Sequence, residues 1–162
     1  MSVEQGLNPE QVKYVRDFIV FLSEKVKNST QDFEGLSKTS QQELLILHIL
    51  SRHSSLRVKD IAHQLSDVSH STLTRMLDRL EENGCIERIL NRDDRRSFLI
   101  KLAQNGQELV NSHNQLMGTM AQTMLEALTP TERLMLIELY AKIWATLEEV
   151  DFSAALLSAT EK

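Results

Sequence analysis

The sequence predicts a mainly α-helical protein that contains a winged helix-turn-helix with a small β-hairpin wing. Five Gly and two Pro among 162 residues favour long, uninterrupted helices. Two short amphipathic segments, at 56–65 and 69–83, are joined by a tight turn, which is typical of a helix-turn-helix. A β-hairpin pattern follows at 85–102, where such a fold carries its wing.

The composition is that of one globular domain, with 41% hydrophobic and 25% charged residues. No apolar run approaches the ~18 residues of a membrane span, and the N-terminus lacks the pattern of a secretory signal. The lone cysteine, Cys85, excludes an internal disulfide framework and a Cys-based zinc ribbon. We therefore expect a cytoplasmic protein with no membrane partner.

Charge is unevenly distributed along the chain. Residues 38–101 hold 11 basic and 9 acidic side chains, a net charge of +2, whereas 1–37 and 102–162 carry net charges of −2 and −5. This pattern would attract a polyanion to the middle of the chain and repel it from the ends. The contrast is modest, and from charge alone a solvated surface of mixed charge is the favoured interpretation.

The first helix is predicted to start at Asn8-Pro9, an N-cap followed by proline in the first turn. Its apolar stripe runs at helical spacing from Val12 to Val26. A connection at 33–38 leads to an N-terminal box at Thr39-Ser40-Gln41-Gln42, and a buried helix should follow to about Arg52.

The helix-turn-helix comes next. A short helix is predicted over 56–65, and after the turn Ser69 caps a second helix that runs to Asn83 and ends at Gly84. The two wing strands are expected at 85–90 and 97–102. The polar turn between them holds three arginines and two aspartates.

A long helix is predicted from about Gln104, and a capping box at 129–132 separates it from a last helix. Residues 151–162 either extend this helix or fray. The helices at both ends of the chain are acidic and strongly apolar, so we expect them to pack together and against a second copy. The predicted organisation is a dimerisation helix and linker at 1–37, the winged helix at 38–102 and dimerisation helices at 103–162, in one integrated domain.

The stretch Val68–Gly106 resembles the recognition helix and wing of the MarR family of bacterial transcriptional regulators, especially in the run TRMLDRL at 74–80. Asp94-Arg95-Arg96 is similar to the family's D-x-R wing signature, and 36–50 is similar to its second helix. The resemblance implies a homodimer on a pseudo-palindromic site in double-stranded DNA. The recognition helix would enter the major groove and the wing the minor groove, and a small ligand or an oxidation event would weaken binding.

The polar side of the predicted recognition helix offers hydroxyl, imidazole and guanidinium groups to base edges and phosphates: Ser69, His70, Ser71, Thr72, Thr74 and Arg75. Arg75 is the first choice for a bidentate contact with guanine, and Thr74 could instead face the wing. The alternative for the whole set is a solvated helix face. Asp78 and Arg79 are candidates for internal ion pairs.

In the wing, Arg96 is the predicted minor-groove contact. The resemblance implies that the Asp94 carboxylate holds the Arg96 side chain in place. Arg92 and Arg95 could meet phosphates, and the alternative is a surface salt bridge at a turn. Four further residues flank the helix-turn-helix and could contact the DNA backbone: Lys38, Thr39, Arg57 and Lys59.

The resemblance also implies a ligand site. Thr74 and Arg88 match residues that bind an aromatic carboxylate such as salicylate, although an exposed strand arginine is an equal alternative. A second candidate pocket would be lined by Phe18, Phe21, His48 and Met117. Ala103 stands where the family usually has Thr, which removes an N-cap and puts the first turn of the long helix in doubt.

No cofactor is expected. The histidines show no H-x-x-x-H spacing, so we expect satisfied core histidines rather than a metal site, and the alternative is a metal site built across separate elements. Cys85 is interpreted as a buried apolar residue rather than a peroxide sensor, since redox-sensing members carry their cysteine in the first helix. No nucleophile–base pair or phosphate-binding loop indicates an enzyme. The prediction is a DNA-binding transcriptional regulator, a repressor relieved by a small ligand. The alternative is a winged-helix anti-repressor or adaptor without DNA binding, against which the basic wing argues.

Overall fold

The computed structural model describes residues 6–31, 35–65, 68–91 and 97–150. The chain divides into two compact units, Met1–Leu116 and Met117–Lys162, and each is described by itself. Within the described residues, no helix combines the length and the hydropathy needed to cross a membrane.

Helix α1 spans Pro9–Gln31 and begins where the sequence predicts it. The Asn8 side-chain oxygen accepts a hydrogen bond from the Glu10 amide at 2.9 Å, which satisfies one free N–H of the first turn. Large apolar side chains of α1 remain exposed, among them Phe18 at 41% and Phe21 at 50%. This surface is available for a partner.

A short 3₁₀ turn, η1 (Leu36–Lys38), precedes α2 (Gln41–Ser51). The N-cap of α2 is Ser40, one residue later than the predicted box, and the Glu43 carboxylate completes a reciprocal capping box with it. The prediction was wrong by one position because the Thr39 hydroxyl donates to the Gly35 carbonyl of the preceding turn. The predicted end of α2 near Arg52 is confirmed.

The helix expected over 56–65 is α3, but it spans only Val58–Gln64. Leu56–Arg57 instead form strand β1, whose residues pair antiparallel with Ile100 and Leu99 of β3. The prediction was wrong here because extended structure in a two-residue strand comes from its partner strand, which is distant in the sequence.

Helix α4 spans His70–Glu82, as the sequence predicts. The Ser69 hydroxyl accepts a hydrogen bond from the Thr72 amide, and Gly84 has φ of +66°, the left-handed stop expected after Asn83. Strands β2 (Ile86–Leu90) and β3 (Phe98–Leu102) then form the predicted hairpin, and the sheet order is β1-β3-β2.

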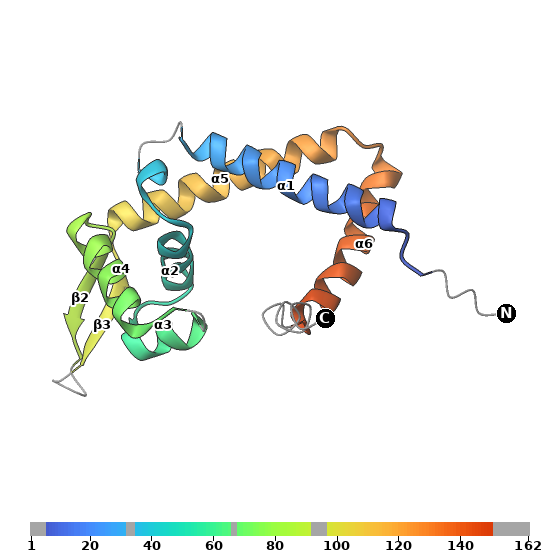
Figure 1. Cartoon of the computed structure of the whole chain (residues 1–162). Coiled ribbons are helices and arrows are strands. Elements are labelled where there is room, and N and C mark those ends of the chain that lie inside the picture. Colours follow the sequence, from blue (N-terminus) through green and yellow to red (C-terminus); the bar gives the residue numbers. More distant parts are fainter. Residues whose placement is uncertain (1–5, 32–34, 66–67, 92–96, 151–162) are drawn as a thin grey trace. The chain divides into compact units, whose positions relative to one another are not determined.

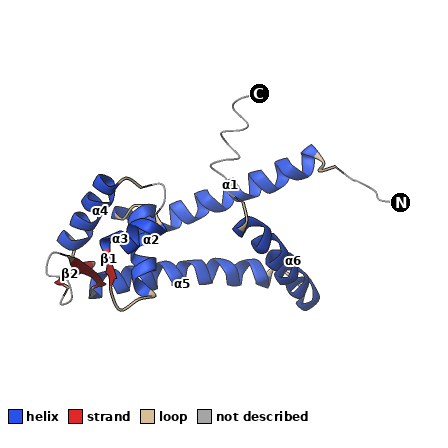
Figure 2. Ribbon diagram, turned by 90° about the horizontal axis from the view of Figure 1, so that it is seen from below, coloured by secondary structure: helices blue, strands red, loops and turns tan. Residues whose placement is uncertain are grey.

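Helices α2, α3 and α4 gather against this sheet in the first unit (Figures 1 and 2). Its largest fully buried side chains come from all of these helices and from β3: Ile46, Leu47, Leu50, Ile61, Leu73, Leu77 and Ile100. The core therefore fixes α4 and the hairpin to the same scaffold.

Helix α5 spans Gln104–Glu126. Its first turn forms although Ala103 offers no side-chain cap, as the hydrogen bond from the Gln107 amide to the Ala103 carbonyl at 3.0 Å shows. The prediction that the lack of a cap at Ala103 puts the first turn of this helix in doubt was therefore wrong. In the second unit α6 spans Pro130–Glu148 behind the predicted capping box of Thr129 and Glu132. The hydrogen bond from the Thr129 amide lowers the pKa of Glu132.

Candidate nucleic-acid interface

Helix α4 has one buried face, two flanks, and an outer face between the flanks. The buried face consists of Leu73, Met76, Leu77 and Leu80. At 100° per residue, one flank carries His70, Thr74, Asp78 and Glu81, and the other carries Thr72 and Arg79. Ser71 and Arg75 lie between the flanks, and both are exposed.

The N-terminal turns of α4 bring the six predicted recognition residues together in space. The Ser69 hydroxyl lies 2.8 Å from that of Thr72 and 3.1 Å from that of Ser71, so these groups form one hydroxyl cluster at the cap. The Thr74 hydroxyl donates to the His70 carbonyl at 2.9 Å. Thr72 is partly buried, whereas Ser69, His70, Ser71, Thr74 and Arg75 are exposed.

A notch of about 260 Å³ separates the start of α2 from α4. Its lining includes Arg75 and Arg79 of α4 and Ser40, the N-cap of α2. The Arg79 guanidinium lies 3.4 Å from the buried Glu43 carboxylate and donates to the Lys38 carbonyl at 3.3 Å. Arg79 therefore takes part in an internal ion pair, as the sequence indicates.

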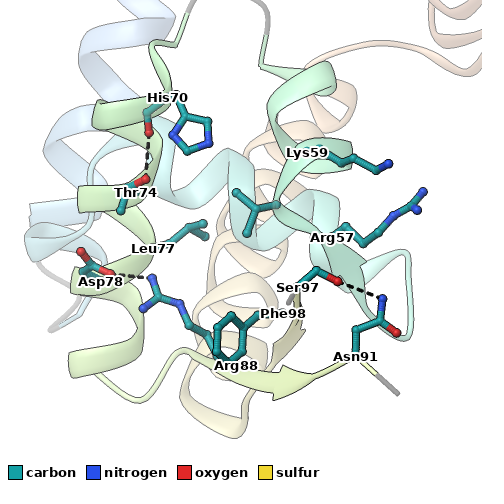
Figure 3. A pocket seen from close by; sticks show the side chains of 11 residues that line it. Arg57, Lys59, His70, Thr74, Leu77, Asp78, Arg88, Asn91, Ser97 and Phe98 are labelled. Carbon is teal, nitrogen blue, oxygen red and sulfur yellow. Dashed lines mark hydrogen bonds and ion pairs between the residues drawn. The ribbon is translucent and has the colours of Figure 1, made fainter. Parts of the chain in front are cut away.

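The opposite flank of α4 faces a larger cavity of about 740 Å³ between α4, α3 and the hairpin (Figure 3). Val58, Leu77 and Phe98 give it an apolar lining. Its polar lining includes Thr74 and Arg88, the two residues predicted to bind a carboxylate, and also Arg57 and Lys59. The cavity thus joins predicted ligand residues to predicted DNA-contacting residues.

The Arg88 guanidinium is already paired with two carboxylates of α4. It lies 2.5 Å from the Asp78 carboxylate and 2.9 Å from that of Glu81 (Figure 3 shows the Asp78 pair). The sequence predicts an internal ion pair for Asp78, but it identifies neither Arg88 as the partner nor Glu81 as the second carboxylate. Asp78 and Glu81 are three residues apart on one helix face, and this spacing was the available signal.

Among the flanking cations, Arg57 forms a two-pronged ion pair with Asp60, at 2.8 and 3.2 Å. This hydrogen bonding raises the pKa of Arg57 and lowers that of Asp60. Lys38 and Thr39 lie at the turn before α2. The predicted wing-tip residues Arg92, Asp94, Arg95 and Arg96 lie outside the described residues.

The second predicted ligand pocket is differently lined. A cavity of about 520 Å³ lies against α1, η1, α2 and α5, and its lining includes Glu24, Lys27 and His113 but none of the predicted Phe18, Phe21, His48 and Met117. His48 instead lies beside this cavity's His113, with His48 Nε2 3.0 Å from His113 Nδ1. Both histidines stand out in the sequence, but no pattern there pairs them.

Burial lowers the pKa of both His48 and His113, and the His113 and Arg52 charges lower that of His48 further. Because the unfolded chain binds more protons below its histidine pKa of about 6.5, the free energy of unfolding should fall as the pH drops below that value. Above it, this contribution is fully present. Thermal unfolding followed between pH 7.5 and 5 should show the loss.

The matched variant for this prediction is the double substitution His48→Gln with His113→Gln, which should flatten the pH dependence of the melting temperature. The control is His53→Gln, since His53 is exposed and lies outside the pair. Equal pH dependence in the double variant and the wild type would contradict the prediction.

Cys85 is buried, and this burial raises the pKa of its thiol, as does the charge of Glu43. A thiol with a raised pKa holds little of the reactive thiolate at neutral pH. The geometry thus agrees with the interpretation of Cys85 as a packing residue.

Comparison with known proteins gives a consistent set of relatives. A family model described as the MarR family matches residues 39–98. The organic hydroperoxide resistance transcriptional regulator of Bacillus subtilis is 35% identical over 104 residues, which cover 63% of this chain and 69% of that protein. Across four curated relatives from B. subtilis, the match spans between 58% and 73% of the relative's own length.

Two solved structures show the same fold. A mutant of S. aureus MepR matches 87% of this chain and 99% of its own, with a TM-score of 0.73 and 22% identity. Streptococcus pneumoniae FabT, solved in complex with DNA, matches 86% of this chain and 99% of its own, with a TM-score of 0.71 and 17% identity. At these identities the likeness concerns the fold alone.

Proposed function

This chain belongs to the MarR family of transcriptional regulators, and from that premise we propose that it binds a specific site in double-stranded DNA through α4. The observation that carries the proposal is the exposed polar surface at the start of α4. Its hydroxyls are ordered by the Ser69 cap, and Arg75 lies exposed between the two flanks. Hydroxyl and guanidinium groups on the outer face of such a helix can bind base edges and phosphates in the major groove.

We further propose a homodimer that binds a pseudo-palindromic site. The apolar side chains of α1, and separately those of α6, support it: Leu134, Ile137, Tyr140 and Trp144 of α6 are between 47% and 72% exposed. Contiguous exposed apolar surface of this kind is typical of protein interfaces. Two α4 helices in one dimer would enter major grooves about 34 Å apart.

The finer proposal is repression relieved by a small aromatic acid. The cavity beside α4 supports it, because its apolar lining suits an aromatic ring and Lys59 in the same lining offers a cation to a carboxylate, whereas Arg88 is already paired with Asp78 and Glu81. Such a ligand would lie against His70, Thr74, Arg57 and Lys59, which we also expect to face DNA. Footprinting upstream of the chain's own gene, with and without salicylate, tests whether a specific DNA site exists and whether an aromatic acid releases the protein from it.

The wing gives a second test. Arg96→Ala should weaken DNA binding and reduce the slope of log affinity against log salt by about 0.9, because it withdraws one cation from the minor groove, which the phosphates of both strands border. A gel-shift titration at several salt concentrations measures both quantities. Wild-type behaviour of Arg96→Ala would remove the wing from the proposal. Absence of any salt-dependent DNA binding by the wild type would favour the anti-repressor or adaptor.

A further inference from the structure

One guanidinium connects the recognition helix to the hairpin. Arg88 extends from β2, and its two terminal nitrogens bind different carboxylates, Nη2 that of Asp78 and Nη1 that of Glu81. The arginine side chain is only 27% exposed, while the two carboxylates are 47% and 41% exposed. We refer to these three residues as the Arg88 clamp.

The clamp acts on the flank of α4 that also carries His70 and Thr74 (Figure 3). Leu77 and Leu80 precede the two clamp carboxylates in the sequence, are almost completely buried, and anchor the adjoining face of the helix in the core. Two ion pairs on one flank and a packed core on the next together fix the rotation of α4 about its axis. That rotation determines the direction in which Thr74 and Arg75 point.

The strand that carries Arg88 is itself held by the core. Arg88 lies opposite Ile100 in the β2–β3 register, and Ile100 is fully buried. The guanidinium therefore starts from a strand that the core holds rigidly. A planar guanidinium can serve two carboxylates at once with fixed geometry, which a single ammonium group cannot do.

We infer that Arg88 is a positioning residue for DNA recognition, which sets the angle between α4 and the wing without itself contacting DNA. This inference rests on the proposed function. Arg88 has both terminal nitrogens engaged by carboxylates, so it is not placed as a phosphate ligand. Its contribution to binding is to hold the major-groove and minor-groove elements in one geometry, so that a single duplex can engage both.

A positioning role and simple electrostatics predict opposite changes in DNA affinity when the two clamp carboxylates are neutralised. Removing negative charge from α4 should strengthen binding to polyanionic DNA if charge alone matters. If the clamp positions α4, the double substitution Asp78→Asn with Glu81→Gln should weaken specific binding instead, by about tenfold, the scale of one mismatched base pair. The salt slope should remain that of the wild type, because no phosphate contact is lost.

The experiment measures affinity and salt slope on a duplex selected from a random library by the wild-type protein. Arg88→Ala should also weaken binding about tenfold with an unchanged slope, and Arg88→Lys should restore only part of the affinity. The matched control is Glu82→Gln, an exposed carboxylate of α4 outside the clamp, which should bind as tightly as the wild type or slightly more tightly. Melting temperatures within about 5 °C of the wild type would show that each variant folds.

The possible outcomes distinguish a failed positioning role from a failed DNA-binding function. If the wild type selects no duplex and shows no salt-dependent binding, the proposed function fails. If the wild type binds but Asp78→Asn with Glu81→Gln binds more tightly, the positioning role is overturned. It is equally overturned if Arg88→Ala lowers the salt slope by about 0.9, because Arg88 would then be a phosphate contact.

Discussion

Replacing Gly106 with alanine is expected to lower the free energy of unfolding by about 3 kcal/mol. A Cβ at this position would lie 2.2 Å from the Cys85 carbonyl oxygen and 2.8 Å from a terminal methyl of Leu102. The carbonyl cannot easily move away, because it accepts a hydrogen bond from the Ala103 amide at 3.0 Å. The added methyl would push the start of α5 away from the hairpin.

Urea unfolding followed by circular dichroism, at one fixed protein concentration, measures the loss. The control is Gly118→Ala in the same helix, where an added Cβ meets nothing within 4 Å. That substitution should leave stability unchanged or raise it by up to ~1 kcal/mol, since alanine favours helix over glycine. Equal unfolding midpoints for Gly106→Ala and the wild type would show that the contact can relax.

The elements that the sequence predicted most accurately are those with short-range causes. Asn8, Ser69 and Thr129 each cap the helix expected of them, because a cap depends on residues two or three positions away. Gly84 ends α4 for the same kind of reason, since its left-handed conformation is a local property.

The features that the sequence did not predict depend on residues distant in the chain. Strand β1 forms because the free edge of β3 accepts it, although Leu56 and its partner Ile100 are far apart in the sequence. His48 and His113 are separated by 65 positions, and Arg88 meets Asp78 across a helix–strand corner. No spacing rule within one element can anticipate these pairs, which follow from how the elements pack.

The candidate site shows the same division. The residue types at the start of α4 directly indicate groups suited to base and phosphate contacts, and they do lie together. Which of the candidate cations are already paired with a carboxylate could not be predicted, because pairing depends on how neighbouring side chains pack. Thus Arg88, predicted to be available for a ligand, is bound by two carboxylates, and Arg57, predicted to contact DNA, is paired with Asp60.

Arg75→Ala is expected to weaken specific DNA binding by about 10- to 100-fold and to relax the preference at one base position. Arg75 is exposed on the outer face of α4. Of its two neighbours, Thr74 is held by the hydrogen bond from its hydroxyl to the His70 carbonyl, and Met76 is held by burial. The Arg75 guanidinium is thus presented from a rigid base. Bidentate binding to guanine uses the planar fork of the guanidinium, which a lysine at this position would not supply.

Selection of binding sites from a random library by the wild type and by Arg75→Ala, followed by affinity measurement at several salt concentrations, tests this prediction. Arg75→Lys is the matched control, because it keeps the charge but loses the fork, so it should retain non-specific affinity and still lose the base preference. A base contact leaves the salt slope unchanged. A uniform loss of affinity across all duplexes, with a slope reduced by about 0.9, would instead make Arg75 a phosphate contact and move base recognition to the hydroxyl cluster of Ser69, Ser71 and Thr72.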